Sequence, residues 1–341
     1  LFRSDYSSLM AYELGAKALA GLLEYSQVDS AQIDMVAMGI VLHEVETSNV
    51  AREAMLAAGL ASTTPAYTTS MAGLSPNIAL TSICDMIALG RIQTGIAAGT
   101  ENFSDVPIRL APRVRRAAMK INQDKSLLNI FKQASTFRPA DLMPAIPSGT
   151  DFTTKQSMGV CAEKMVKKFG VSREESDAFT ERSHQLALNA WTKGFYQPDI
   201  VPVTVNHSTL VERDNSMRAD ASLSKLSQLQ PVFDRKNGIV TAGNSSRYTD
   251  GAGAVLITSL QRANQQKQEP LAAVRDYAFS GVTDLATEML LGPAMAIPKL
   301  LQRNGLTIDN IDVWEVHEAF AAQLLANQAC LRSAQFAKNY L

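Results

Sequence analysis

A bend between a strand and a helix lies near residue 73 of this 341-residue chain. Residues 66–70 are rich in threonine and include a tyrosine, which predicts the end of a buried strand. We expect a helix from Ser75, because a proline follows in its first turn and Gly90 can end it. Such a bend directs free backbone N–H groups and the positive end of the helix dipole at one residue, where a thiolate nucleophile would be stabilised. That residue is Gly73, which carries no side chain.

Two further segments combine polar side chains with a change of secondary structure. The sequence HEAF begins at His317 and lies where an expected buried strand, residues 311–316, passes into a helix. Such a bend can hold a polar group at the carboxyl end of a sheet, although a lone histidine is more often a structural residue. The sequence TAGNSS, residues 241–246, is a Gly-containing loop before an expected strand at 252–258. Taken alone, such a loop is more often an ordinary Gly-rich turn.

Composition argues against several classes of function. With 46% apolar residues the chain can bury a substantial core, in two domains or one large one. Its formal net charge of −1 gives no indication of nucleic-acid binding, and no apolar run reaches the roughly 18 residues that a membrane helix needs. The three cysteines lack the spacing of metal ligands, so we expect no metal site and the reduced thiols of an intracellular protein. The first residues lack a secretory signal pattern and an initiator methionine, so a transit peptide could have been removed.

Helices and strands are expected to alternate along most of the chain. A helix with leucines on one face precedes a strand at 33–42, a short helix begins at Ser48, and another buried strand covers 94–99. This alternation implies parallel strands in an α/β layered fold, interrupted by a proline-rich excursion at 100–154. The later elements that we expect are helices at 157–170 and 172–194, strands at 201–205 and 271–281, and a polar loop at 211–230.

The end of the chain repeats a pattern from its beginning. Leu22 and Leu23 precede Ile33 and Asp34, and an equivalent set of two leucines and an Ile-Asp pair lies 278 residues further on. In both places a helix would end at the leucines and a strand would begin at the Ile-Asp pair. The repeat predicts two similar α/β halves, with chance as the alternative because amphipathic spacing is common.

Five motifs occur in order along nearly the whole chain: SNVAREA, GTENFSDVPIR, SMGVCAEKM, TAGNSSRYTDGAGAV and HEAFAAQLLAN. Together they resemble the thiolase family, in particular the long-chain 3-ketoacyl-CoA thiolases that form the β-subunit of the fatty-acid-oxidation trifunctional enzyme. Most thiolases have Asn-Glu-Ala-Phe where these β-subunits and this chain have His-Glu-Ala-Phe. The resemblance implies a duplicated, layered α/β/α/β/α fold. Its N-terminal half would be residues 1–101 and 242–258, its C-terminal half residues 259–341, here incomplete, and a cap or loop insertion over the CoA site would be residues 102–241.

The resemblance also implies an acyl-transfer site. Family members carry a nucleophilic cysteine at the position of Gly73, in a context similar to the preceding TSMA. By matching positions, His317 would help to form an oxyanion hole for the thioester carbonyl, Glu318 would support it, and Phe320 would contact the pantetheine arm of CoA. Family members carry a catalytic histidine and a second cysteine in a segment after HEAF, and no match to that segment lies among these 341 residues.

The remaining implied contacts are with CoA itself. Ala242 would pack on the pantetheine arm and Ser246 would hydrogen-bond to it. Arg218 matches an arginine close to the CoA nucleotide. Ser157 and Met158 match a segment at the mouth of the acyl site, where His-Met-Gly is more usual.

The implied reaction is thiolysis of a 3-ketoacyl-CoA by CoA, giving acyl-CoA and acetyl-CoA in fatty-acid β-oxidation, with CoA or acyl-CoA as substrate and no tightly bound cofactor. Gly73 supplies no thiol, and Cys84 is about three helical turns further on. Three hypotheses therefore stay open: an acyltransferase in a form that does not turn over, a catalytically silent CoA-binding or scaffolding subunit, and a CoA-dependent enzyme of altered chemistry such as decarboxylation.

The expected partners also follow from the resemblance. We expect a homodimer, with a trifunctional-type α-subunit as a further candidate, in the bacterial cytoplasm or in mitochondria. Segment 109–132 carries seven cationic residues and one acidic residue, a local net charge of +6. Three interpretations of this segment stay open: a solvated or subunit-contacting face, attraction of a CoA phosphate, and contact with an anionic membrane surface.

Overall fold

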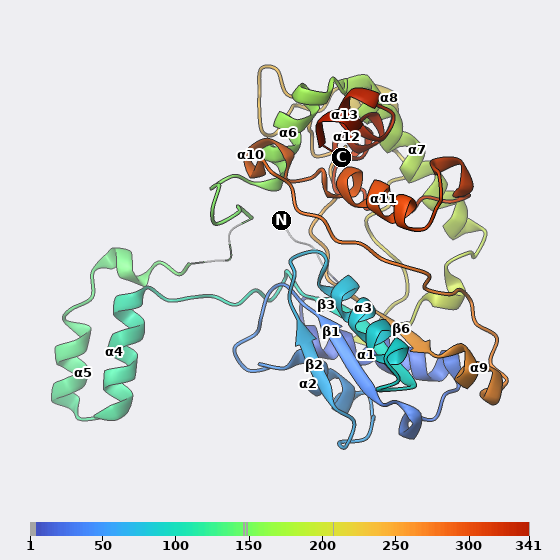
Figure 1. The fold of residues 1–341 in the computed structure, drawn as a ribbon. Coiled ribbons are helices and arrows are strands. Elements are labelled where there is room, and N and C mark those ends of the chain that lie inside the picture. The colour runs from blue at the N-terminus through green and yellow to red at the C-terminus, as the bar shows by residue number, and fades with distance from the viewer. Residues whose placement is uncertain (1–4, 146, 148, 207, 341) are drawn as a thin grey trace. The chain divides into compact units, whose positions relative to one another are not determined.

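The structure is a computed structural model that describes residues 5–145, 147, 149–206 and 208–340 (Figure 1). The chain divides into two compact units. Unit 1 comprises Leu1–Ser148, Val203–Leu210 and Thr249–Pro270, and unit 2 comprises Gly149–Pro202, Val211–Tyr248 and Leu271–Leu341. The division into halves and a cap that the sequence suggested stays a prediction.

Unit 1 is built on a four-stranded sheet with the order β2-β1-β3-β6. Its strands are β1 (Met35–Gly39), β2 (Ala66–Thr69), β3 (Thr94–Glu101) and β6 (Gly251–Thr258). Strand β1 pairs in parallel with β2 and β3, because helices carry the chain back between them, and β6 closes the sheet antiparallel to β3. All four lie where the sequence predicted strands, which confirms that part of the α/β assignment.

Helices cover both faces of this sheet. Alternate residues of a strand point to opposite faces, so Val36 and Met38 of β1 pack in one cluster with α1 (Ala11–Ser26) and α2 (Val50–Ala57). The intervening Ala37 packs in another cluster, with Ala79 of α3 (Ser75–Ala88). Unit 1 therefore has three layers, helix, sheet and helix (Figure 1).

The excursion after β3 forms a helical hairpin in unit 1. Its helices are α4 (Pro112–Gln123) and α5 (Leu127–Ala134), which pack against each other, and the 3₁₀ turn η2 (Pro139–Leu142) follows (Figure 1). Ser126 begins α5, because its side chain accepts a hydrogen bond from the Asn129 N–H at 3.3 Å. The last helix of the unit is α9 (Leu260–Gln266).

Unit 2 is mainly helical. Its helices are α6 (Met158–Phe169), α7 (Arg173–Thr192), α8 (Leu223–Leu226), α10 (Leu285–Glu288), α11 (Gly292–Arg303), α12 (Ala321–Leu331) and α13 (Ala334–Tyr340). Helix α12 packs on α6 and α7, and Met165 of α6 shares a buried cluster with Ala326 and Cys330 of α12. Ser172 begins α7 through the predicted capping box with Glu175. Unit 2 also contains the 3₁₀ turn η3 (Gln197–Asp199), whereas the two-stranded sheet of β4 (Val203–Val205) and β5 (Thr209–Val211) lies mostly in unit 1.

Two strand predictions were wrong. Residues 271–281 and 311–316 form no strand, and neither has a ladder neighbour in the part of the chain that the structure describes. An apolar run indicates burial, but a strand exists only where another strand pairs with its backbone. The residues Leu271 and Val313 are accordingly 88% and 75% exposed.

The predicted repeat is present in part. Helix α1 is followed by the 3₁₀ turn η1 (Ser30–Gln32), and α11 is followed by the 3₁₀ turn η4 (Ile308–Asn310), 278 residues further along the chain. The strand that should complete each copy forms only in the first, as β1. No helix among the described residues is long and apolar enough to cross a membrane.

Candidate active site

The bend before α3 is held in one conformation by short hydrogen bonds. Ser75 is fully buried, and its hydroxyl accepts from the Met71 N–H at 2.8 Å and donates to the Ala72 carbonyl at 2.6 Å. The Thr69 hydroxyl donates to the Ser75 carbonyl at 2.9 Å. Ala72 has a φ of +46°, a left-handed conformation that costs energy in a residue with a side chain. Gly73 follows this residue and is exposed at the start of α3.

Two glycines bring the first turn of α3 against the carboxyl ends of the parallel strands. A Cβ on Gly39 of β1 would lie 2.3 Å from the carbonyl carbon of Ser75, and one on Gly99 of β3 would lie 2.5 Å from Cγ of Pro76. Larger residues at either strand end would push the helix away. The bend therefore sits at the edge of an α/β sheet where ligands usually bind.

Gly73 itself has no steric need to be glycine. A Cβ built at this position has no heavy atom of the described chain within 4 Å, apart from its own neighbours in sequence. Its φ angle is also outside the left-handed region. The bend could carry a side chain without any displacement of the backbone.

None of the three cysteines lies in the bend. All are free thiols: Cys84 is half-buried in α3, and Cys161 and Cys330 are buried in unit 2. Burial raises the pKa of each thiol, with Asp85 adding to the effect at Cys84, and the pKa of Cys330 is raised to about 11. These thiols are protonated near neutral pH and lack the environment of a nucleophile.

In unit 2, the loop at 241–246 pairs with the segment that contains HEAF. The Ser246 N–H donates to the Ala319 carbonyl at 2.8 Å, and the Ala321 N–H donates to the Asn244 carbonyl at 3.1 Å. An isolated antiparallel bridge joins Ser245 to Phe320 between these two bonds. The structure thus brings together the predicted pantetheine contacts Ala242, Ser246 and Phe320. The first two are exposed, and Phe320 packs partly on the buried cluster of Val240 and Ala322.

The two polar residues of HEAF lie at the exposed end of the same segment. His317 is exposed, and Glu318 accepts a hydrogen bond from the hydroxyl of Ser183, on α7, at 2.5 Å. Helix α7 therefore fixes the direction of the Glu318 carboxylate. The sequence had indicated Glu318 but not this serine.

The backbone at Arg218 is tied to α7 as well. Its N–H donates to Nδ1 of His184 at 3.3 Å, and the Arg218 side chain is exposed. Burial first, and then the cationic charge of Arg218 and Arg247, lower the pKa of His184, against the raising effect of Glu318 and Asp220. The imidazole is therefore neutral at pH 7 and can accept this bond.

The predicted acyl-mouth residues begin α6. The Ser157 side chain accepts from the Val160 N–H at 3.3 Å, so it caps the helix, and Met158 is the first helical residue. The next residue, Gly159, allows close contact with Phe233, since a Cβ there would lie 1.9 Å from the Phe233 ring. A helix cap is a sufficient structural reason for serine at position 157.

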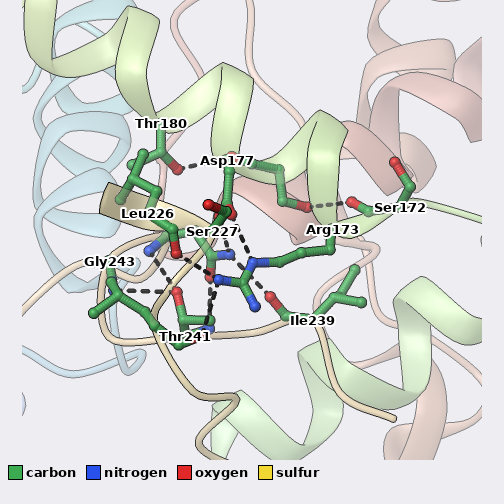
Figure 2. Close-up of polar contacts among 12 residues, drawn as sticks. Ser172, Arg173, Asp177, Thr180, Leu226, Ser227, Ile239, Thr241 and Gly243 are labelled. Atoms are coloured by element: carbon green, nitrogen blue, oxygen red, sulfur yellow. Dashed lines mark hydrogen bonds and ion pairs between the residues drawn. The ribbon is translucent and has the colours of Figure 1, made fainter. Parts of the chain in front are cut away.

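A buried polar network in unit 2 was not predicted (Figure 2). Asp177 of α7 accepts from Nε of Arg173 at 2.7 Å and from the side-chain amide of Asn244 at 3.0 Å. Glu163 of α6 accepts from the Ile239 N–H at 2.8 Å and the Val240 N–H at 3.0 Å. The two acids are 67 to 77 residues away from their amide partners in sequence, so no local motif indicated these contacts. The asparagine of TAGNSS was the one visible signal.

Comparison with known proteins assigns the family. Residues 1–261 match the model "Thiolase, N-terminal domain" and residues 268–339 match "Thiolase, C-terminal domain". The chain is 40% identical over 338 residues to the mitochondrial trifunctional enzyme subunit beta of Bos taurus, which covers 99% of this chain and 70% of that protein. It is 38% identical over 337 residues to a 3-ketoacyl-CoA thiolase of Serratia proteamaculans, covering 98% of this chain and 77% of the other.

A solved structure agrees with this assignment. The acetyl-CoA acetyltransferase of Bacillus anthracis superposes with a TM-score of 0.83 at 28% identity, over 97% of this chain and 80% of that one. The chain belongs to the thiolase family and has its fold, which confirms the resemblance inferred from the five motifs. Among the described residues, no group of three histidine, cysteine or acidic residues could hold a metal ion.

Proposed function

We propose that this protein binds CoA thioesters in the manner of a 3-ketoacyl-CoA thiolase, and that the chain with Gly73 does not form the acyl-enzyme. The observation that carries the proposal is glycine in a hydrogen-bonded bend at the amino end of α3, where a thiolase needs its nucleophile. The free space at this position argues that a thiol would fit and is simply not supplied.

The thiolase reaction shows which step needs a side chain at residue 73. A thiolate attacks the 3-keto carbon, the C2–C3 bond breaks, and the departing acetyl-CoA carbanion takes up a proton. The acyl group then passes from the enzyme sulfur to the thiol of a second CoA. Without a side chain at residue 73 the first bond cannot form, and His317, supported by Glu318, would be left to bind the thioester carbonyl.

The proposed CoA site uses the loop and segment that pair in unit 2. Ala242 and Ser246 would line the pantetheine arm beside Phe320, with Arg218 at the nucleotide end and Ser157 and Met158 near the acyl group. Two observations support this assignment: the backbone pairing of the loop with the HEAF segment, and the exposed guanidinium of Arg218. The alternative is a silent CoA-binding or scaffolding subunit. Such a subunit would share this CoA site but would stay inactive whichever residue occupied position 73.

Calorimetry and intact-mass measurement test the proposal together. We expect CoA to bind the 341-residue chain, Arg218→Ala to weaken that binding, and incubation with a 3-ketoacyl-CoA to leave the protein mass unchanged. A covalent acyl adduct would contradict the claim that no acyl-enzyme forms. Equal CoA affinity of the wild type and Arg218→Ala would contradict the role of Arg218 in CoA binding. Thiolysis by a Gly73→Cys variant would favour the acyltransferase over the silent subunit.

We further propose that the α4–α5 hairpin contacts anionic membrane surfaces, as one of the three interpretations of segment 109–132 suggested. Exposed apolar side chains support this choice over a purely solvated face: Leu127, Leu128 and Phe131 of α5 are 74%, 83% and 74% exposed. These apolar residues lie in segment 109–132, which carries a net charge of +6. Most of the cationic residues lie on α4 and the exposed apolar residues on α5, so the hairpin as a whole combines the two kinds of side chain that interfacial binding uses. A homodimer, an α-subunit partner, and residence in the bacterial cytoplasm or in mitochondria are proposed with it.

A further inference from the structure

Helix α7 presents one polar face to segments that are far apart in sequence. Arg173, Asp177, Glu181 and His184 follow one another at intervals of three or four residues, so they lie along one side of the helix. Arg173 donates to the carbonyls of Leu226 and Leu229, and Glu181 accepts from the Leu223 N–H. His184 accepts from Arg218, as described above.

Asp177 is the most buried member of this face, with 2% of its surface exposed. One carboxylate oxygen is held by Arg173 at 2.7 Å, and the other accepts from the Asn244 amide at 3.0 Å (Figure 2). A buried carboxylate without both partners would carry a large desolvation cost. Because Arg173 holds the Asp177 carboxylate on one side, the free oxygen of that carboxylate fixes the position of the Asn244 side chain.

Asn244 in turn organises the loop at 241–246. Its side chain donates to the Ile239 carbonyl at 2.9 Å and accepts from the Thr241 N–H at 2.8 Å, which closes the loop on itself. Its backbone carbonyl accepts from the Ala321 N–H. The Asn244 side chain thus joins Asp177 of α7, Ile239 just before the loop and Thr241 in the loop, and its backbone carbonyl holds the HEAF segment.

We propose that Asp177, fixed by Arg173, is a positioning residue for the CoA site, because it holds the loop at 241–246 in place through Asn244. This inference rests on the proposed function, because the site is the proposed CoA site. Asp177 touches no CoA atom in this proposal. Its effect passes through the asparagine side chain to the two segments that would line the ligand.

An exchange of the two side chains tests the proposal. In Asn244→Asp a second carboxylate faces Asp177 in place of the amide that donates a hydrogen bond to it. We expect the CoA affinity, measured by calorimetry, to fall about tenfold, which is the effect of losing one charge-assisted hydrogen bond. Adding Asp177→Asn to it restores a donor facing an acceptor, so affinity should recover most of that loss. If Asn244→Asp does not fold, Asp177→Asn alone is used for the CoA-affinity measurement, because it buries no additional charge.

Hydrogen exchange supplies a readout that does not need the ligand. We expect faster exchange in peptides covering 241–246 and 319–321 in Asn244→Asp, reversed in the double variant. The matched control is Glu288→Gln, since Glu288 is 3% exposed in the same unit and bonded to Lys168 and Tyr340, away from the loop. This control should lower stability without changing CoA affinity.

The outcomes separate the two proposals. If the double variant binds CoA no better than Asn244→Asp, or if Glu288→Gln weakens CoA binding as much, the positioning role is refuted. If wild type binds no CoA, the proposed function fails, and hydrogen exchange still decides whether Asp177 holds the loop. Unchanged exchange at 241–246 in every variant would overturn the proposal whatever the ligand data show.

Discussion

At the scale of single residues, the site is defined by what surrounds Gly73 more than by Gly73 itself. The bend around it keeps three side-chain hydrogen bonds and a left-handed Ala72, although no nucleophile is present. Strained backbone of this kind persists only where the surrounding contacts hold it. The geometry for presenting a side chain at the amino end of α3 is therefore complete.

A cysteine placed in this bend should be unusually reactive. In Gly73→Cys we expect the new thiol to have a lowered pKa, because it sits at the amino end of α3, and to react with iodoacetamide about tenfold faster at pH 7 than Cys84. Peptide mass spectrometry over a time course gives both rates in one sample. The wild type is the control for Cys84, whose burial raises its pKa. Equal rates at the two positions would show that the bend does not activate a thiol.

His184 should make the stability of the chain depend on pH. Folding lowers its pKa, mainly by burial, so the unfolded chain binds its proton at a higher pH than the folded chain does. The free energy of unfolding should therefore fall as pH drops from about 6.5 towards the lower folded pKa, and this contribution should be constant above that window. His184→Asn keeps an acceptor for the Arg218 N–H and removes the titration.

Urea unfolding of wild type and His184→Asn at a series of pH values checks this. The difference between the two proteins isolates His184 from the carboxylates, which titrate in both. We expect that difference to change between pH 7 and pH 5. A difference that stays constant over this range would mean that His184 has the same pKa in the folded and unfolded chains.

At the scale of elements, two helices position the residues of the proposed sites. Helix α3 is brought against the sheet edge by Gly39 and Gly99, and α7 holds the loop and segments of the proposed CoA site through one polar face. The hairpin of α4 and α5 is the element proposed to contact membranes, and its apolar side chains are exposed.

The hairpin proposal predicts a lipid dependence. Chain binding to vesicles that contain phosphatidylserine should exceed binding to phosphatidylcholine alone, and Leu128→Ser with Phe131→Ser should reduce it at least about tenfold, since burying each apolar side chain is worth roughly 1.5–3 kcal/mol. Co-sedimentation measures this. Leu260→Ser, at a 68% exposed position on α9, is the matched control. Equal binding to both vesicle types would exclude the electrostatic part of the proposal.

At the scale of the whole molecule, the residues that the proposal names are divided between the two units. Unit 1 carries the bend at Gly73, and unit 2 carries Arg218, the loop at 241–246 and the HEAF segment. The four-stranded sheet of unit 1 ends in two edge strands, β2 and β6. An unpaired edge is a template for another strand, which agrees with the proposed homodimer.

Light scattering tests the oligomeric state. We expect a mass of twice the chain's 36.9 kDa that persists on dilution. A mass equal to one chain at every concentration would refute the homodimer. A larger, fixed multiple would instead indicate a higher assembly.

The amino-acid sequence by itself determined the family, the bend at Gly73, the four strands of unit 1 and the capping box that begins α7. These features depend on local order: motif, periodicity and the residues next to a helix end. Only the tertiary structure decided that 271–281 and 311–316 pair with no strand among the described residues, and that Asp177 reaches Asn244 across 67 residues of chain. Strand pairing and buried hydrogen bonds join groups that are distant in sequence, so no local pattern contains them.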